Sequence, residues 1–438
     1  MQLFRSIIFI FLLFLTVHFQ AQVSATERKI ITAVDKRIPA ATELLLKVVN
    51  INSGTMNFEG VKKVGNVFIE ELKPLGFETR WSPGDAFNRA GHLVAVHKGK
   101  KGPKILFVGH LDTVFELDSP FQSSKMLNDS IIQGPGTMDM KGGDVIIILV
   151  MQSLYDAGLL DEMNIEIVMT GDEELSGEPL ELSKKDLIEA AERADIALGY
   201  EDGDGLSTTA IVSRRGSADW ELTVKGNAAH SSQIFTEKVG AGAIYEASRI
   251  LNEFYLTLSK EENLTFNPGL IVGGNKVTFD EEKNTGTAFG KNNIVSQDVI
   301  VRGDLRALSK AQLEKAKKIM QEIVATNYPQ TTATIEFLEG SYPPMTLTEG
   351  NKKLLGYFNK ASLDLGYGTV VAVNPRNAGA ADISFASDLV EMAIDGLGLP
   401  GADGHTINET ANLNYLPIEA KRSALLVYRL CNSKIEMK

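Results

Sequence analysis

The stretch "KILFVGHLDTVFE" (residues 104–116) joins an apolar run to a polar turn. The run KILFV predicts a strand that is buried on both faces. His110 and Asp112 follow at the point where this strand ends. Because side chains two positions apart in an extended chain point to the same side, the carboxylate can reach the imidazole. Proteins orient a metal-binding histidine in this way, although an ordinary polar turn is the alternative on these residues alone.

Strands and helices alternate on both sides of this stretch. Apolar runs predict further strands within 91–99, 164–174 and 195–202, and a helix over 141–158 that is apolar nearly all round and therefore buried. The alternation predicts an α/β fold with a mostly parallel central sheet covered by helices on both faces. In such sheets ligands bind beyond the carboxyl ends of the strands, and polar residues cluster there three times in this chain.

The pattern changes in the middle of the chain. Residues 213–342 follow the order β-α-β-β-α-β, which predicts a compact α+β, ferredoxin-like unit with two helices on an antiparallel sheet. After "SYPP" the alternating pattern returns. We interpret this as one domain inserted into another, with the outer domain, which carries the clustered polar residues, formed by residues 26–212 and 343–438.

The first 25 residues differ from the rest. They contain one cation, Arg5, an apolar stretch from Ile7 to Leu15, and small residues that end at Ala25. This order predicts a secretory signal peptide over residues 1–25, and hence a periplasmic or secreted protein without a membrane span after cleavage. An uncleaved anchor is the alternative, although the apolar part is shorter than the roughly 18 residues that a span requires. Cleavage after Ala21 and after Ala25 both fit.

Composition narrows the possible partners and metal ligands. The chain has 438 residues, 44% of them hydrophobic, and a formal net charge of −12, which makes nucleic acid an unfavourable partner. A single cysteine, Cys431, excludes an intramolecular disulfide and a cysteine-rich zinc cluster. Any metal ion must therefore be held by His, Asp and Glu.

Acids and a second histidine occur in loops that follow the predicted strands. Taken singly, each has an ordinary interpretation as a helix cap, a solvated acid, a charged turn or a surface histidine. Taken together with His110, they form the set that two close divalent ions need, with one bridging carboxylate and a further carboxylate free to act as a base. The residues are Asp139 in "GPGTMDMKGGD", Glu173 and Glu174 in "TGDEELSG", Glu201 in "LGYED", and His405 in "LGLPGADGHTINE".

Eight motifs in a fixed order carry a resemblance to a known family. They are "GHLDTV", "GPGTMDMKGG", "TGDEELSG", "GYED", "VKGNAAHSS", "NNIVSQDVIVRGDLRAL", "NAGAADISF" and "LGLPGADGHTINE". Each motif is weak alone, but all eight together resemble the M20 metallopeptidases, a family with a co-catalytic pair of zinc ions. The resemblance spans nearly the whole chain after the predicted signal and is strongest to the carboxypeptidase G branch.

The resemblance implies two Zn²⁺ per chain, for which Co²⁺ or Mn²⁺ can substitute, and a role for each residue. His110 and Glu201 would bind the first ion, Glu174 and His405 the second, and Asp139 both. Asp112 would orient His110, and Glu173 would be the general base. A cis peptide bond is expected directly after the bridging aspartate. The inserted domain would form a homodimer, and the substrate-binding residues would be His230, given to the partner's site, together with Asn293, Arg306 and Gly379.

The predicted function is hydrolysis of the amide bond of a small peptide or N-acyl amino acid. The most specific form of this prediction is the release of a C-terminal glutamate. An N-acyl amino acid deacylase or desuccinylase is the first alternative. A binding protein that kept the fold without the chemistry is the second, and the presence of Glu173 argues against it. The resemblance to the carboxypeptidase G branch implies extra basic residues that hold the carboxylates of a substrate glutamate, one after the Glu201 strand and one near the end of the inserted domain. The corresponding stretches of this chain, "EDGDGLSTT" and "LEGSYPP", contain no Lys or Arg. Arg214 and Arg215 either replace them or form a solvated face. Closure of the domains about residues 212 and 342 is a further hypothesis.

Overall fold

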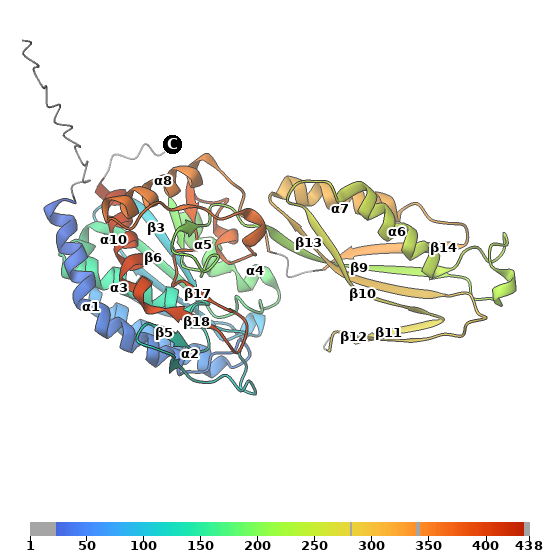
Figure 1. The fold of residues 1–438 in the computed structure, drawn as a ribbon, viewed down its shortest axis with the longest axis horizontal. Helices are drawn as coiled ribbons and strands as arrows, with labels where there is room; N and C mark the ends of the chain where they lie inside the picture. The colour runs from blue at the N-terminus through green and yellow to red at the C-terminus, as the bar shows by residue number, and fades with distance from the viewer. Residues whose placement is uncertain (1–22, 281–282, 339–341, 433–438) are drawn as a thin grey trace, which may run out of the picture.

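The computed structural model describes residues 23–280, 283–338 and 342–432. The predicted signal peptide therefore lies almost wholly outside the described residues. The chain forms two sheets, each with its own helices, in two lobes that lie side by side along the longest axis (Figure 1). In the described part of the chain, no helix combines the length and the apolar character needed to cross a bilayer.

The large sheet has six strands in the order β1-β2-β6-β3-β7-β16. The last four run parallel to one another, whereas β1 and β2 form an antiparallel edge. This confirms the α/β class with a mostly parallel central sheet. The strands are β1 (Glu78–Pro83), β2 (Gly91–His97), β6 (Met163–Thr170), β3 (Lys101–His110), β7 (Ile196–Gly199) and β16 (Met392–Ile394).

Helices cover both faces of the large sheet. Ile105 and Phe107 of β3 pack into the core that contains the longer helices, while Leu106 and Val108 face the shorter ones. The strand is thus buried on both faces, as predicted from KILFV. The first face carries α1 (Ala25–Val49), α2 (Phe58–Leu72), α3 (Lys141–Asp156), α8 (Glu349–Asp364) and α10 (Leu416–Asn432). The second carries α5 (Lys185–Arg193) and α9 (Ile383–Ala386), with α4 (Leu180–Ser183) just before α5.

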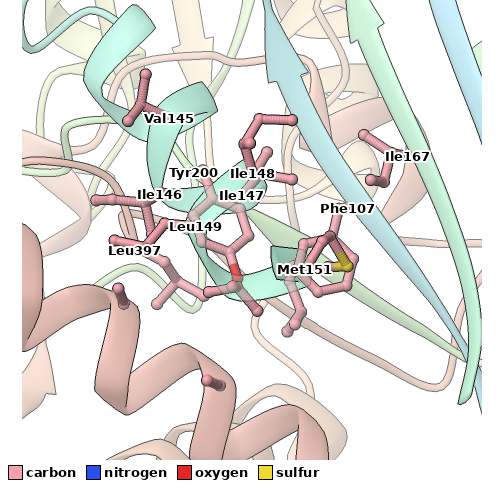
Figure 2. Close-up of a cluster of buried hydrophobic side chains, with 14 of the residues drawn as sticks. Phe107, Val145, Ile146, Ile147, Ile148, Leu149, Met151, Ile167, Tyr200 and Leu397 are labelled. Carbon is pink, nitrogen blue, oxygen red and sulfur yellow. The ribbon is translucent and has the colours of Figure 1, made fainter. Parts of the chain in front are cut away.

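Helix α3 lies at the centre of the first core. Every residue from Lys141 to Leu154 is buried, which confirms the prediction of a helix that is apolar nearly all round. Its isoleucines and Met151 lie among Phe107, Ile167 and Tyr200 from the sheet side (Figure 2). Cys431 is buried in α10. This core fixes the start of α3, and with it the loop that carries Asp139.

The small sheet has four antiparallel strands in the order β10-β13-β9-β14, with two helices packed on it. The elements occur in the predicted order, while the domain boundaries at 212 and 342 stay a prediction. They are β9 (Gly216–Gly226), α6 (Ala243–Leu258), β10 (Thr265–Gly274), β13 (Asp298–Ala307), α7 (Lys310–Val324) and β14 (Thr331–Phe337). A hairpin of β11 (Lys276–Asp280) and β12 (Thr285–Phe289) was not predicted.

Short strands join distant loops of the large-sheet lobe. One sheet has the order β17-β18-β5-β4, and in it Thr410 pairs with Gln133. A parallel pair joins β8 to β15. These strands are β4 (Lys125–Met126), β5 (Ile131–Gln133), β8 (Thr209–Ala210), β15 (Val371–Ala372), β17 (Gly401–Ala402) and β18 (Thr410–Asn412). The β18–β5 pairing brings the loop before β18, which carries His405, next to the loop that carries Asp139.

Candidate metal centre

The five predicted ligands lie at one edge of the large sheet. His110 is the last residue of β3, and Glu174 and Glu201 follow the ends of its parallel neighbours β6 and β7. Carboxyl ends of parallel strands meet at the same edge, which explains why residues so far apart in sequence converge. Asp139 lies just before α3, and His405 reaches the same point from the loop between β17 and β18.

Asp139 joins two groups of potential ligands. The Nε2 atom of His110 lies 3.1 Å from Asp139 Oδ1 and 3.4 Å from Glu201 Oε1. The Nε2 atom of His405 lies 2.9 Å from Asp139 Oδ2 and 3.2 Å from Glu174 Oε2. Within each group the ligand atoms all lie within 4.8 Å of one another. The structure thus forms the predicted pairs, one on each side of Asp139.

The charges at this edge favour cations. Burial and the nearby Asp139 raise the pKa of Glu174 to about 7. Hydrogen bonds to Asp139 and Glu174 raise the pKa of His405 to about 11. Neighbouring carboxylates repel one another, which raises their pKa values. Divalent cations between them remove this repulsion, so that all of the carboxylates can be ionised. Imidazole nitrogens and carboxylate oxygens are also ordinary zinc ligands, so the donor set fits two such ions.

Asp112 lies behind His110, where the sequence analysis placed it. Its Oδ1 atom is 3.4 Å from His110 Nδ1, and its own carbonyl oxygen is 3.1 Å from the same nitrogen. The carboxylate has a further role that was not predicted, because it accepts the N–H groups of Glu173 (3.1 Å) and Glu174 (3.2 Å) and the hydroxyl of Thr55 (2.7 Å). One buried carboxylate thereby holds both the histidine and the loop of the two glutamates.

Glu173 follows β6 in the same loop as Glu174. Burial raises its pKa well above the usual range, and the charges of Glu201, Asp382 and Glu174 add to this rise. A carboxyl whose pKa is shifted toward neutrality is suited to accept and return a proton. Its electrostatic interaction with Glu201 of one ligand group and Glu174 of the other agrees with the predicted role of general base, which stays a prediction.

Glu409, the last residue of the motif "LGLPGADGHTINE", has a structural role that was not predicted. It is fully buried and accepts the N–H groups of Gly136 (3.3 Å), Met138 (2.9 Å) and Asp139 (3.3 Å). These bonds fix the turn that presents Asp139, and the Asp139–Met140 peptide bond that follows is cis. An acid four residues after His405, in a loop otherwise rich in glycine, was the available signal.

Residues 106–429 match the profile of the peptidase family M20/M25/M40. The chain belongs to this family. A curated relative, carboxypeptidase G2 of Pseudomonas sp. (strain RS-16), is 27% identical over 399 residues, which cover 90% of this chain and 89% of the relative. The succinyl-diaminopimelate desuccinylase of Hydrogenovibrio crunogenus is 24% identical over 385 residues, covering 85% of this chain and 94% of that enzyme.

Solved structures share the fold at lower identity. The aminopeptidase PepT of Bacillus cereus superposes with a TM-score of 0.68 at 18% identity, covering 90% of this chain and 98% of that one. The YXEP protein of Bacillus subtilis, described as a dinuclear metal-binding peptidase of the M20 family, gives a TM-score of 0.63 at 15% identity, with coverages of 91% and 99%. This M20 chain is therefore an enzyme of the peptidase and amidohydrolase class.

The predicted substrate residues of this M20 chain do not all lie together. His230 and Asn293 are exposed and adjacent, since residue 230 bridges to residue 294 and the Asn293 carbonyl accepts the N–H of Ser231. Arg306 lies at the opposite end of β13, paired with Ser217 at the start of β9. Within one chain, almost the full length of the ten-residue strand β13 thus separates His230 from the crossing, the two chain segments that connect the small sheet to the large sheet.

Arg214 corrects one interpretation of the sequence. It is 4% exposed, so the pair of arginines does not form a solvated face. Its Nε atom donates to Asp395 (2.8 Å), and Nη1 donates to the carbonyl of Gly379 (2.9 Å). Asp395 also accepts the N–H of Glu201 at 3.3 Å. Arg214 and Asp395 thereby link the Gly379 loop to a predicted ligand, a contact that no local sequence pattern reveals.

Proposed function

We propose that this M20 enzyme is a dizinc exopeptidase of the carboxypeptidase type. It hydrolyses the amide bond of a small peptide or N-acyl amino acid and releases the C-terminal amino acid. The observation that carries the proposal is the pair of ligand groups that share Asp139, with Glu173 next to the ligand Glu174 in the loop after β6. His110 and Glu201 would hold one ion, and Glu174 and His405 the other, with Asp139 between them. When bound, two zinc ions lower the pKa of a shared water and polarise the amide carbonyl.

Glu173 performs the proton transfers in this proposal. Its carboxylate takes a proton from the attacking water as the oxygen–carbon bond forms, and it later gives that proton to the leaving nitrogen as the carbon–nitrogen bond breaks. Asp112 fixes the backbone of Glu173 and the ring of His110 throughout. Neither residue changes its net charge over a full cycle, so the reaction balances as the addition of one water molecule to an amide.

A cluster of three arginines supports recognition of a substrate carboxylate. Arg215 donates to the hydroxyl of Thr265 (2.9 Å) and to the carbonyl of Arg376 (3.0 Å). Burial lowers the pKa of Arg215, and the positive charges of Arg306 and Arg376 lower it further. Asp304, which pairs with Arg306 at 2.8 Å, offsets part of this repulsion. Such repulsion is relieved by a bound anion. The cluster lies close to the Gly379 loop and supplies the basic residues missing from the expected positions.

The first experiment measures metal and activity on the same purified protein. Metal content per chain is determined, the metal is removed with a chelator, zinc is restored, and amino-acid release is assayed with N-acyl glutamates, other N-acyl amino acids and dipeptides. About two zinc ions per chain and zinc-restored release of the C-terminal residue are expected. No release from any member of the panel after zinc is restored would contradict the proposal.

A second assay tests the arginine cluster. Arg306→Ala should raise KM at least about tenfold for a substrate with a free α-carboxylate, because a charge-assisted hydrogen bond is lost. The same variant should have little effect on the corresponding α-amide. Equal effects on the two substrates would show that the cluster does not bind the carboxylate.

Desuccinylation is the second candidate function. The 24% identity to succinyl-diaminopimelate desuccinylase extends over 385 residues, which keeps this activity open. Both reactions hydrolyse an amide at the same centre, so only the preferred acyl group separates them. N-succinyl amino acids in the substrate panel distinguish the two functions. Faster amino-acid release from these than from N-acyl glutamates would favour a desuccinylase.

We also propose that the enzyme is exported and acts as a homodimer. In the described chain, Ser24 caps α1 through a capping box with Glu27, and Glu27 accepts a hydrogen bond from Arg429 (2.7 Å). Cleavage after Ala21 preserves this cap, whereas cleavage after Ala25 removes it at a cost of about 1 kcal/mol. N-terminal sequencing of the exported protein tests the cleavage site.

The proposed homodimer rests on His230. This histidine is exposed and distant from the segments that connect the two sheets of its own chain, so it is suited to complete the site of a partner subunit.

A further inference from the structure

Tyr342 lies where the chain returns from the small sheet to the large sheet. Its carbonyl accepts the N–H of Ser217 (3.0 Å), which is next to the first residue of β9. Three residues on, Met345 and Arg214 exchange two backbone hydrogen bonds of 3.0 and 3.1 Å. The two segments that connect the sheets therefore run antiparallel and are paired, with Tyr342 at the end nearer the small sheet.

The side chain of Tyr342 reaches the loop of the predicted base. Its hydroxyl donates to the carbonyl of Glu173 (2.9 Å) and lies 3.0 Å from the hydroxyl of Ser176. The ring packs edge-on against Phe385, with centroids 5.0 Å apart. Burial raises the pKa of Tyr342 well above its usual range, so the hydroxyl keeps its proton and stays a donor.

A buried lysine, Lys184, holds the same loop through Asp172. Lys184 is fully buried and lies 3.1 Å from Asp172 Oδ1 and 3.0 Å from Asp382 Oδ1. Asp172 also accepts the N–H of Gly177 (2.9 Å), which closes the loop that contains both glutamates. The Lys184 ammonium lies 5.6 Å from the centre of the Tyr342 ring, close enough for a cation–π contact.

These contacts fix the backbone of Glu173 on both sides. Its N–H is bound to Asp112 (3.1 Å) and its carbonyl to Tyr342 (2.9 Å), so its carboxylate extends from a peptide segment with little freedom to move. A base displaced by about 1 Å loses a large part of its rate advantage. Of the two anchors, Asp112 belongs to the large sheet, whereas Tyr342 belongs to the crossing.

We propose that Tyr342 is a positioning residue for Glu173 and couples the placement of the base to the segments that carry the small sheet. The proposal rests on the function proposed above. It adds a residue outside the predicted ligand and substrate sets, whose hydroxyl acts on the reaction only through the backbone of Glu173.

The test is Tyr342→Phe in the full-length, zinc-loaded enzyme. The ring and its packing are kept, and only the hydroxyl is removed. We expect kcat to fall about tenfold with KM within about twofold of wild type, since the lost hydrogen bond orients the base and does not touch substrate. Zinc content and Tm should match wild type. Tyr255→Phe, which alters a tyrosine that is 62% exposed on α6, is the matched control.

A second measurement does not depend on activity. Hydrogen–deuterium exchange of a peptide covering residues 171–177 should be faster in Tyr342→Phe than in wild type and unchanged in Tyr255→Phe. Wild-type kcat in Tyr342→Phe would overturn the proposal, as would an unchanged exchange rate. A fall in kcat that matches a loss of zinc or of folded protein would also overturn it. Absence of hydrolysis in the wild-type enzyme would instead refute the proposed function, and the exchange rates would still show whether Tyr342 holds the loop.

Discussion

His110, at the end of the large sheet, is 1% exposed and contacts two carboxylates through one nitrogen and Asp112 through the other. His230, beyond the end of the small sheet, is exposed, and its ring contacts Ser232 (2.8 Å). The first histidine is oriented by side chains of its own lobe, whereas the second is held by the hydroxyl and the N–H of one neighbouring residue, Ser232. This difference indicates that the large sheet contains a preorganised centre, and it agrees with our proposal that His230 completes the site of a partner subunit.

The same contrast appears in the ion pairs. In the large-sheet lobe, Lys184 with its two aspartates and Arg214 with Asp395 are buried beside the candidate centre. In the small-sheet lobe, Arg306 with Asp304 and Lys225 with Asp298 remain partly exposed, whereas Glu246, which pairs with Arg249, is buried. Loss of one partner of a buried pair strongly lowers the free energy of unfolding, because the other charge is left buried and unpaired. Exposed pairs contribute little to stability. The comparison therefore predicts a large loss of stability when Lys184 or Arg214 is replaced, and a small one when Arg306 or Lys225 is replaced.

The largest expected effect is at Glu173. Glu173→Ala should lower kcat about 10³-fold, because the proton acceptor is removed, while about two metal ions per chain stay bound. Steady-state kinetics and metal analysis on the same sample check this. Turnover equal to wild type would show that another group is the base.

Lys184→Met tests the buried pairs. It should lower the free energy of unfolding by about 3–5 kcal/mol, because Asp172 and Asp382 are left without their buried cation. Urea unfolding followed by circular dichroism gives this value. The neighbouring Lys185→Met is the matched control, since that side chain is 62% exposed and should change stability by less than about 0.5 kcal/mol. Similar values for the two variants would show that the buried pairs of Lys184 do not stabilise the large-sheet lobe.

His230→Ala tests the exposed histidine. We expect kcat to fall about 10²-fold with Tm unchanged, because in our proposal His230 stabilises the oxyanion and its exposed side chain contributes little to folding. If His230 serves the partner, mixed subunits of His230→Ala and Glu173→Ala should regain activity, up to about a quarter of wild type for random pairing. Unfolding and refolding the two variants together, against each alone, measures this. No recovery in a mixture that forms dimers would contradict sharing between subunits.

The smallest effect concerns pH and metal removal. In the metal-free protein the pKa of Glu174 is raised to about 7 and that of His405 to about 11, so folding takes up protons at both groups. The stability that Glu174 contributes in its protonated form is lost as pH rises from its unfolded value toward 7, and that of His405 is lost progressively above its unfolded value. The Tm of chelator-treated protein should therefore fall by a few degrees between pH 6 and pH 8.

Zinc should reverse this trend, because metal binding requires the deprotonated ligands and strengthens as pH rises. Differential scanning calorimetry at both pH values, with and without zinc, makes the comparison. A Tm of the metal-free protein that rises from pH 6 to pH 8 would show that other groups dominate its pH dependence.

Local pattern in the sequence determined much of the fold. The apolar run before His110 specified a strand buried on both faces, and the continuous apolar segment after Asp139 specified the buried helix α3. Both follow from side-chain periodicity over a few residues, which is a property of the chain itself. The predicted ligands could be found because each follows a strand of one parallel sheet or lies in a glycine-rich loop.

Only the tertiary structure decided the remaining contacts. The β18–β5 pairing that brings His405 to Asp139, the burial of Arg214 against Asp395, and the position of Tyr342 under Glu173 join residues more than 150 positions apart. Such contacts depend on the packing of whole elements and leave no periodic trace in either segment. The chain's local patterns thus identify the groups that can bind metal, while long-range packing decides which residues hold those groups in place.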